Sequence, residues 1–231
     1  MISDGQLFKI ACTRPWLVAT FGAPRRMVSW SLNRPGFVTG ERVVWLEVKN
    51  TELAGIEDHL GWFQGRLSDA SLTDAVGLVT ARDVSCHELA VADVEGVRAE
   101  CLITLGLNNG ETVGARMDAS AHPLNAGTIN ILVAVSRPLT DAALLELSSI
   151  ATQARTAALV DLGYRRPGMT DVVTGTGTDC IVVAAPAEGT PQLYAGMHTA
   201  VGEAVGRAVR EATLAASRAW LAARRLAGLD P

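Results

Sequence analysis

The side chains best suited to chemistry lie in the C-terminal third of the 231-residue chain. Gly175-Thr176-Gly177-Thr178-Asp179 supplies hydroxyls and a carboxylate, and the segment from Tyr194 to Thr199 adds an imidazole at His198. Glycine lets a backbone approach a ligand closely because it carries no side chain. Hydroxyls, a carboxylate and an imidazole that converge can activate water, stabilise an oxyanion and move protons. The spacing therefore predicts a catalytic or ligand-binding site.

The glycine-threonine segment has two interpretations. It has no Walker lysine and does not fit a dinucleotide-binding fingerprint. As a tight connection before a strand, its Thr and Asp side chains would satisfy backbone groups. As a ligand-cradling loop, Gly175 and Gly177 would let the ligand approach, Thr176 and Thr178 would offer hydroxyls, and Asp179 would orient a base or a water.

His198 is expected just before the last helix, with Thr199 as its N-cap. A helix N-terminus presents free N–H groups and partial positive charge, which suit an anion or a developing oxyanion. Glu203 falls in the first turns of the same helix. A lone histidine is often structural, but this setting makes His198 a candidate general base.

Two asparagines are candidates for binding amide groups of a substrate. Asn109 lies in Gly106–Gly110, where the simpler interpretation is a turn. Asn130 lies within the apolar run Thr128–Val135, and a buried amide there needs a hydrogen-bond partner. A structural bond explains Asn130 as well as ligand contact does.

Strands fill the first half of the chain and helices the second. Short apolar runs bounded by Pro, Gly or Asn, and one helical spacing, are typical of the first half. The expected strands are 7–12, 16–21, 27–32, 42–48, 75–80, 87–94, 97–105, 128–135 and 180–185, with a helix over 56–67. Long helices are expected over Asp141–Leu162, capped by Thr140 and Gly163, and from Thr199 to about Leu226.

This order predicts a mixed α/β fold of the α+β class. We expect a single domain, residues 1–231, with a mixed β-sheet and two long helices in the C-terminal half. A content of 48% hydrophobic and 19% charged residues is sufficient for a substantial core. Gly202 and Gly206 lie four apart in the last helix, so that face can pack closely within the chain or in a homodimer.

Composition argues against several classes of partner. The net charge is −4 and there is no basic block, so nucleic-acid binding is not expected. No apolar run is long enough to span a membrane, and the first residues do not resemble a signal peptide, so a cytoplasmic location is expected. The cysteines have no metal-ligand or redox spacing and are expected to be small buried apolar residues. We expect no bound metal and no other cofactor.

Six fragments in this order resemble the adenosylcobinamide amidohydrolase family, which removes the aminopropanol arm of adenosylcobinamide to give adenosylcobyric acid. They cover roughly residues 25 to 212 and are Leu78–Val84, Thr104–Asn109, Ala126–Ile131, Ala151–Leu159, Thr174–Asp179, and Tyr194–Thr199 followed by Gly202, Glu203 and Gly206. The resemblance implies a small-molecule substrate, a corrinoid or another amide, and hydrolysis of an unactivated amide bond.

The resemblance also implies roles for individual residues. His198 would act as the base or protonate the leaving nitrogen, with Asp179 orienting it or a water. Thr176, Thr178 and N–H groups at the last helix would hold the oxyanion, and Glu203 would assist. Asn109, Asn130 and Tyr194 would bind substrate, as would Gln153 and Arg155.

The chain departs from the family pattern at three positions. Gln153 stands where the family has Glu, and Arg155 and Met197 stand where it has Lys. Three functions therefore remain open: cleavage of a cobinamide-like corrinoid, hydrolysis of a different amide or lactam on the same fold, and non-catalytic binding of a corrinoid or other small molecule.

Overall fold

A bent mixed sheet of eight strands organises the chain. The computed structural model describes residues 5–53, 55–115 and 127–229. The sheet has the order β4-β3-β2-β10-β8-β6-β5, and β1 pairs with β2. Its strands are β1 (Lys9–Thr13), β2 (Trp16–Ser29), β3 (Gly36–Glu47), β4 (Val76–Thr80), β5 (Glu88–Val94), β6 (Val97–Leu105), β8 (Ile129–Val135) and β10 (Cys180–Pro186).

Short segments and helices complete the fold. A second sheet consists of β7 (Gly110–Glu111) and β9 (Gly175–Thr176). The helices are α1 (Asn50–Leu53), α2 (His59–Asp69), α3 (Asp141–Leu162) and α4 (Ala200–Leu226), with a 3-10 turn at Val84–Cys86. The predicted class, a mixed sheet with two long C-terminal helices, is confirmed. The predicted homodimer stays a prediction.

Strand β2 joins the two halves of the main sheet. Its first part pairs with β1 and its last part with β10, while β3 pairs with both parts. The pairing with β3 shifts register between Thr20 and Arg25. The prediction of separate strands at 16–21 and 27–32 is therefore wrong. Pro24, which cannot donate to a ladder, lies within this irregularity, so the strand continues past it.

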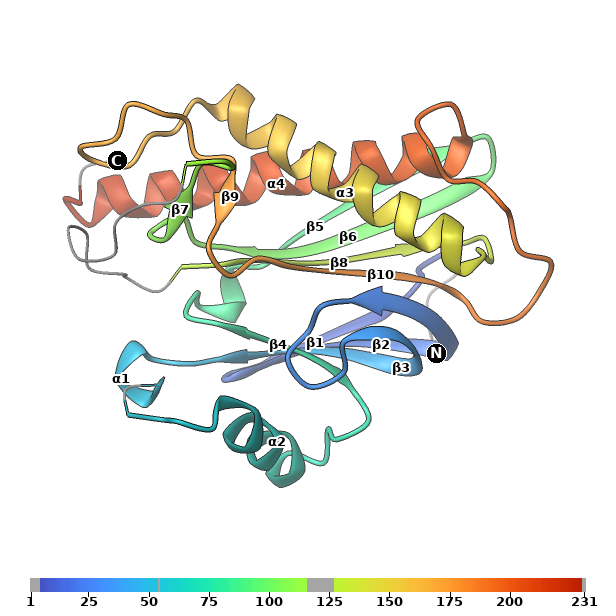
Figure 1. Ribbon diagram of the computed structural model, residues 1–231, viewed down its shortest axis with the longest axis horizontal. Coiled ribbons are helices and arrows are strands. Elements are labelled where there is room, and N and C mark those ends of the chain that lie inside the picture. The colour runs from blue at the N-terminus through green and yellow to red at the C-terminus, as the bar shows by residue number, and fades with distance from the viewer. Residues whose placement is uncertain (1–4, 54, 116–126, 230–231) are drawn as a thin grey trace.

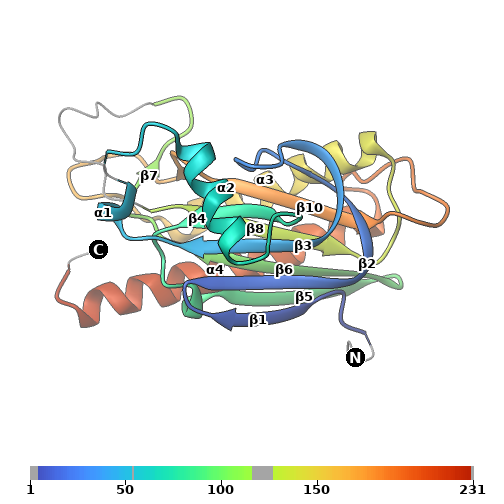
Figure 2. The ribbon, with the colours of Figure 1, turned by 90° about the horizontal axis from the view of Figure 1, so that it is seen from below.

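The bend produces four layers. In Figure 1, α3 and α4 lie over the half that contains β5, β6, β8 and β10, and the half with β1 to β4 lies beneath it. Figure 2 shows α2 against the lower half, on the face away from α3 and α4. Three apolar clusters fill the spaces between layers. Strand β8 is buried along its whole length, as predicted.

The two long helices have the caps that the sequence indicates. Thr140 Oγ1 accepts from the Ala143 N–H at 3.2 Å, and Gly163 ends α3 with φ of 68°. Thr199 Oγ1 accepts from the Gly202 N–H at 3.0 Å and begins α4. Side-chain acceptors at these positions satisfy N–H groups that have no partner within the helix. The bounds predicted for α3 are confirmed, and those for α4 differ by one residue.

Helix α4 packs within the molecule along most of its length. Its buried residues run from Val201 to Trp220, and the Trp220 ring meets Tyr164 edge-on with centroids 5.3 Å apart. The intramolecular alternative for this helix is thus confirmed for that stretch. Among the described residues, no helix combines the length and the apolar character needed to cross a membrane.

Candidate active site

A cavity of about 1160 Å³ lies between α3, α4 and the small β7–β9 sheet. It is larger than the roughly 300–1,000 Å³ typical of small-molecule sites. Six of the sequence-predicted site residues line it, and they come from α3, from the glycine-threonine loop and from the start of α4. They are Gln153, Arg155, Gly175, Thr176, Asp179 and Glu203.

Asp179 is the centre of the polar network at this cavity. Its Oδ1 accepts from the Ile129 N–H at 3.0 Å and from the Thr176 hydroxyl. Its Oδ2 accepts from the Thr176 N–H at 3.0 Å and from Arg155 Nη1. Four donors on one carboxylate stabilise its charge and fix its position. Asp179 thereby fixes the hydroxyl of Thr176 and the guanidinium of Arg155 on one wall of the cavity.

Arg155 forms a largely buried ion pair with Asp179. The exposed fractions of the two side chains are 11% and 10%. Burial lowers the pKa of Arg155 to about 10. Its Nε–H is buried and has no acceptor among the described residues. Arg155 lines the cavity, so its positive charge is suited to an anion or a developing oxyanion bound there.

Gly175 allows the loop to lie against this ion pair. A Cβ atom at Gly175 would come within 2.8 Å of both Arg155 Nη1 and Asp179 Oδ2. The two-residue strand β9, which contains Gly175 and Thr176, pairs with Gly110 and Glu111 of β7. This pairing secures the loop at the cavity. Gly175 makes room for the ion pair, and Asp179 accepts from two backbone N–H groups, as the interpretation of the segment as a tight connection expects. The ligand-cradling interpretation stays a prediction.

Two of the departures from the family pattern lie at the outer part of the cavity. Gln153 is exposed, and its Nε2 donates to Ser149 Oγ at 3.0 Å. Met197 is 66% exposed and lines the cavity just before α4. Together with Arg155, all three departures border one cavity. Glu203 is also exposed and pairs with Arg207 one turn along α4.

The remaining loop residues lie beside the cavity without lining it. The Thr178 side chain is exposed, and the Thr178 carbonyl accepts from Thr128 Oγ1 at 2.9 Å. The Gly177 N–H donates to the Asn109 carbonyl at 3.3 Å. Asn109 is buried, and its Oδ1 has no hydrogen-bond partner among the described residues.

Three other predicted site residues lie away from this cavity. Asn130 Nδ2 donates to the Val79 carbonyl at 2.8 Å, so the amide has the structural partner that the sequence required. Leu132, two residues further along β8, packs between the sheet halves. Side chains two apart on a strand point to the same face, so Asn130 also lies on the face away from the helices. Tyr194 is 72% exposed and borders a separate hollow of about 450 Å³. His198 is exposed and lines neither the cavity nor the separate hollow.

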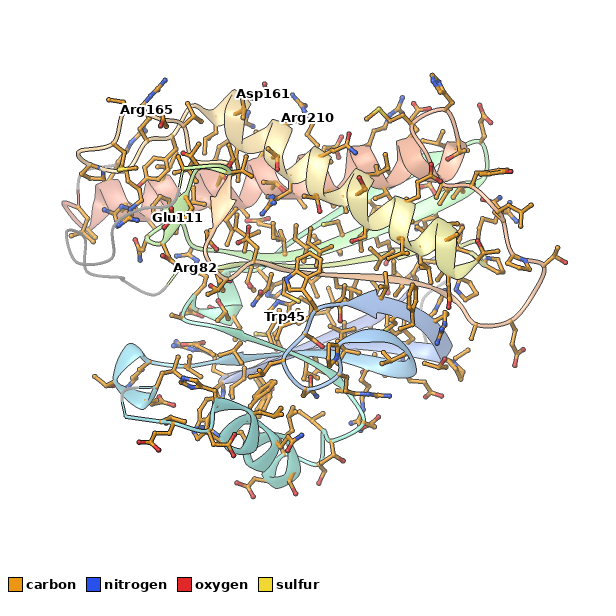
Figure 3. The ribbon with its side chains drawn as sticks, viewed as in Figure 1. Trp45, Arg82, Glu111, Asp161, Arg165 and Arg210 are labelled. Atoms are coloured by element: carbon orange, nitrogen blue, oxygen red, sulfur yellow. The ribbon has the colours of Figure 1, made fainter. Side chains whose placement is uncertain are left out.

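Several lining residues were missed by sequence reasoning. Arg210 of α4 pairs with Asp161 of α3 across the outer edge of the cavity, and Glu111 lies on β7. Figure 3 shows Asp161 and Arg210 together above Glu111. Glu203 and Arg207 are four residues apart on a predicted helix, and this spacing indicates an ion pair that could be predicted from the sequence. The Asp161–Arg210 pair joins residues 49 apart, so no local pattern indicates it.

The other reactive side chains are the cysteines and the residues that could bind a metal ion. Cys101 and Cys180 are buried as predicted, whereas Cys12 and Cys86 are exposed, so the prediction is wrong for those two. Cys12 lies near the edge of the sheet on β1, and Cys86 ends the 3-10 turn. Among the described residues, no three His, Cys, Asp or Glu side chains are grouped to hold a metal ion.

Comparison with protein families matches residues 2–225 to the profile described as adenosylcobinamide amidohydrolase. The chain belongs to the adenosylcobinamide amidohydrolase family. A relative with that name from Halobacterium salinarum is 33% identical over 135 residues, which are 58% of this chain and 52% of the relative. An uncharacterized protein of Methanocaldococcus jannaschii is 36% identical over 91 residues, 39% of this chain and 35% of that protein. These alignments thus span about half or less of the relatives' lengths.

Solved structures give more distant matches. A Burkholderia beta-aminopeptidase has a TM-score of 0.43 at 14% identity and covers 94% of this chain and 87% of its own. A Pyrococcus horikoshii protein has a TM-score of 0.42 at 12% identity, covering 87% and 76%. Likenesses of this size carry no conclusion about activity.

The hydrogen bonds of Asp179 involve residues from the fragments that resemble the family. The donors to its carboxylate come from three of the resembling fragments, through Ile129, Arg155 and Thr176. Three of the six fragments that resemble the family therefore meet at one carboxylate on the wall of the cavity.

Proposed function

We propose that this protein is an amide-bond hydrolase that removes the aminopropanol arm of adenosylcobinamide and releases adenosylcobyric acid. The observation that carries the proposal is the Asp179 network, which fixes a hydroxyl and a guanidinium on the wall of a large cavity. Membership of the adenosylcobinamide amidohydrolase family supports the choice of substrate.

The reaction adds water across an amide bond and yields a carboxylic acid and an amine. A tetrahedral oxyanion forms on the way, and the leaving nitrogen takes up a proton. Arg155 supplies a cation at the cavity wall, so its positive charge stabilises the oxyanion. The Thr176 hydroxyl donates its proton to Asp179, so its oxygen presents lone pairs that accept a hydrogen bond from the attacking water.

Asp179 itself is a positioning group in this scheme. Its two oxygens already accept from four donors, one of them a guanidinium, so both are engaged in holding the site together. Proton transfer therefore needs a second group. Glu203 lines the cavity and serves this role when its pair with Arg207 opens. His198 remains the alternative base proposed from the sequence.

The size and the apolar side chains of the region suit a large substrate. Leu193, Tyr194 and Met197 are all strongly exposed on the segment that leads into α4. Met197 lines the cavity, whereas Leu193 and Tyr194 border the separate hollow on the same segment. Exposed apolar side chains are typical of ligand-binding surfaces. In the proposal the bulk of the corrinoid lies over this segment while its arm enters the cavity beside Thr176.

The test is incubation of the purified protein with adenosylcobinamide, with mass spectrometry for adenosylcobyric acid and aminopropanol. Thr176→Val keeps the shape and removes the hydroxyl, and we expect kcat to fall by about 100-fold or more. Thr178→Val changes the neighbouring exposed threonine and should retain most activity. Equal rates for the two variants contradict the assignment of Thr176.

The same assay with the variants His198→Ala and Glu203→Gln identifies which of the two residues transfers the proton. Loss of turnover in Glu203→Gln with retention in His198→Ala supports proton transfer from within the cavity. The opposite result supports the base proposed from the sequence. Absence of product from folded wild-type protein contradicts the proposed function.

A second function is favoured by one observation. Gln153, Arg155 and Met197, the three departures from the family pattern, all line the same cavity. Changes concentrated at one cavity fit a hydrolase redirected to another amide or lactam. Met197→Lys distinguishes the two functions, because cobinamide cleavage that appears only in this variant indicates a redirected wild-type enzyme.

A further inference from the structure

The glycine-threonine loop is held from both sides by residues next to the strands that flank β10. Strand β10 lies between β8 and β2 in the sheet, and Asp179 directly precedes it. Next to β8, Thr128 Oγ1 donates to the Thr178 carbonyl at 2.9 Å. Next to β2, the indole N–H of Trp30 donates to the Asp179 carbonyl at 2.6 Å. Two successive carbonyls of the loop therefore accept from side chains on opposite sides of it.

On the β2 side the backbone ladder stops short of the loop. Strand β10 pairs with β8 from Cys180 onward, but it pairs with β2 only from Val183 onward, opposite Val28. Trp30 lies two residues beyond Val28, and its side chain reaches Asp179 past the end of the ladder. The indole N–H thus supplies a donor to a backbone carbonyl that this ladder does not reach.

Burial of the ring does not account for a tryptophan at this position. Trp30 is 51% exposed, whereas Trp45 in the core is fully buried. Burial therefore stabilises the fold less at Trp30 than at Trp45, because less apolar surface leaves water. The only polar group of an indole is an N–H that donates, and Trp30 uses it for the bond to Asp179.

The position of the Asp179 main chain matters because its side chain arranges the site. The carboxylate accepts from Thr176 and Arg155, and both residues line the cavity. The bond from Trp30 restricts rotation of the peptide group that follows Asp179, so the residue is fixed at its carbonyl as well as at its carboxylate. A misplacement of about 1 Å in a catalytic group can lower a rate by about 100-fold.

We propose that Trp30 is a positioning residue, whose indole N–H holds the Asp179 main chain so that the carboxylate keeps Thr176 and Arg155 in place for hydrolysis. Trp30 does not itself line the cavity, so it acts through Asp179 and not through contact with the substrate there. This inference rests on the proposed function, because it assumes that Thr176 and Arg155 act on the amide. It adds a residue outside the cavity to the groups that set the rate.

The experiment replaces Trp30 with the benzothiophene analogue of tryptophan, which has sulfur in place of the N–H and keeps the shape of the ring. We expect kcat for adenosylcobinamide to fall by about 5- to 10-fold with less than about a twofold change in KM, because the cavity lining is unchanged. The melting temperature should fall by less than about 4 °C, since one hydrogen bond at the surface is lost. A fluorinated tryptophan that keeps the N–H should retain kcat.

The matched control is the same replacement at Trp62, which is half-buried on α2 and should leave kcat unchanged. An unchanged kcat in the Trp30 replacement overturns the inference. A rise in KM with unchanged kcat also overturns it, because that result means that Trp30 contributes to substrate binding and not to the position of Asp179.

Hydrogen–deuterium exchange of residues 175–180 reports on the loop without substrate. In the Trp30 replacement the amides of this segment should exchange about fivefold faster or more, and unchanged exchange contradicts a role for Trp30 in holding the loop. Absence of hydrolysis by folded wild-type protein counts against the proposed function, while the exchange rates still decide whether Trp30 positions Asp179.

Discussion

At the scale of single residues, Asp179 connects the glycine-threonine loop to a side chain on helix α3. Thr176 lies three positions away, within reach of local sequence reasoning, and does hydrogen-bond to Asp179. Arg155 lies on another element, and only folding brings it to the same carboxylate. A carboxylate and a guanidinium that are both mostly buried depend on each other, because either one alone would be a buried unpaired charge.

Removal of this carboxylate should be costly. Asp179→Ala leaves Arg155 buried without its counter-ion and leaves two backbone N–H groups without an acceptor. We expect a loss of about 3–5 kcal/mol in the free energy of unfolding, measured by urea titration. The matched control is Asp141→Ala, which removes an exposed pair with Arg26 and should cost about 0–1 kcal/mol. Similar losses in the two variants would contradict the buried role of Asp179.

Thiol chemistry gives a second prediction at this scale. Burial raises the pKa of Cys101, and it raises the pKa of Cys180 to about 12. The thiolate is the reactive form, so both should resist alkylation near pH 8, whereas the exposed Cys12 and Cys86 should react. Mass spectrometry after iodoacetamide treatment locates the modified residues. Urea should expose the protected pair, and modification of Cys101 in native protein would contradict the packing around it.

At the scale of elements, the start of α4 depends on close backbone packing. A Cβ atom at Gly202 would come within 2.2 Å of the Gly196 carbonyl oxygen and 2.7 Å of that of Ala195. Glu146 of α3 secures the same turn, because its Oε2 accepts from the Ala195 N–H at 2.6 Å. The wall of the cavity at Met197 and Glu203 is therefore set by a glycine contact and a hydrogen bond from the neighbouring helix.

Two glycines of α4 should respond in opposite ways to alanine. Gly202→Ala forces a side chain into backbone oxygens, and we expect it to lower the free energy of unfolding by about 1–3 kcal/mol. Gly206→Ala places its Cβ at 3.9 Å from Ile150 Cγ2, which is an ordinary contact. It should raise the free energy of unfolding by up to about 1 kcal/mol. Thermal and urea unfolding of both variants test this contrast. A neutral Gly202→Ala would mean that the turn moves freely.

At the scale of the whole molecule, two half-sheets enclose an apolar core of their own. Trp45 is fully buried there, with side chains from both halves in the same cluster. The sheet can form this core because β2 crosses from one half to the other through its irregular segment. Burial of aromatic surface between the halves fixes their relative position, and with it strand β8, which begins at Ile129, and strand β10, which Asp179 directly precedes.

A cavity in this core should destabilise the whole fold. Trp45→Ala should lower the free energy of unfolding by about 3–5 kcal/mol, because neighbouring side chains from both half-sheets cannot fill the space. Trp62→Ala is the control, since Trp62 is only half-buried on α2 and should cost clearly less. Coincident loss of signal from both half-sheets on urea titration would agree with one cooperative core. A small effect at Trp45 would contradict it.

The sequence by itself determined the two long helices, most strands and the glycine-threonine loop. It did not predict α1, and it placed the start of α2 three residues early. Caps such as Thr140 and Gly163 act over a few residues, and strand alternation reflects one buried face, so local patterns carry this information. It also determined the family, because short fragments keep their order along the chain. Tertiary structure alone decided that Arg155 meets Asp179 and that Asp161 meets Arg210. Ion pairs between separate elements leave no periodic signal, since their partners are set by how the helices pack on the sheet.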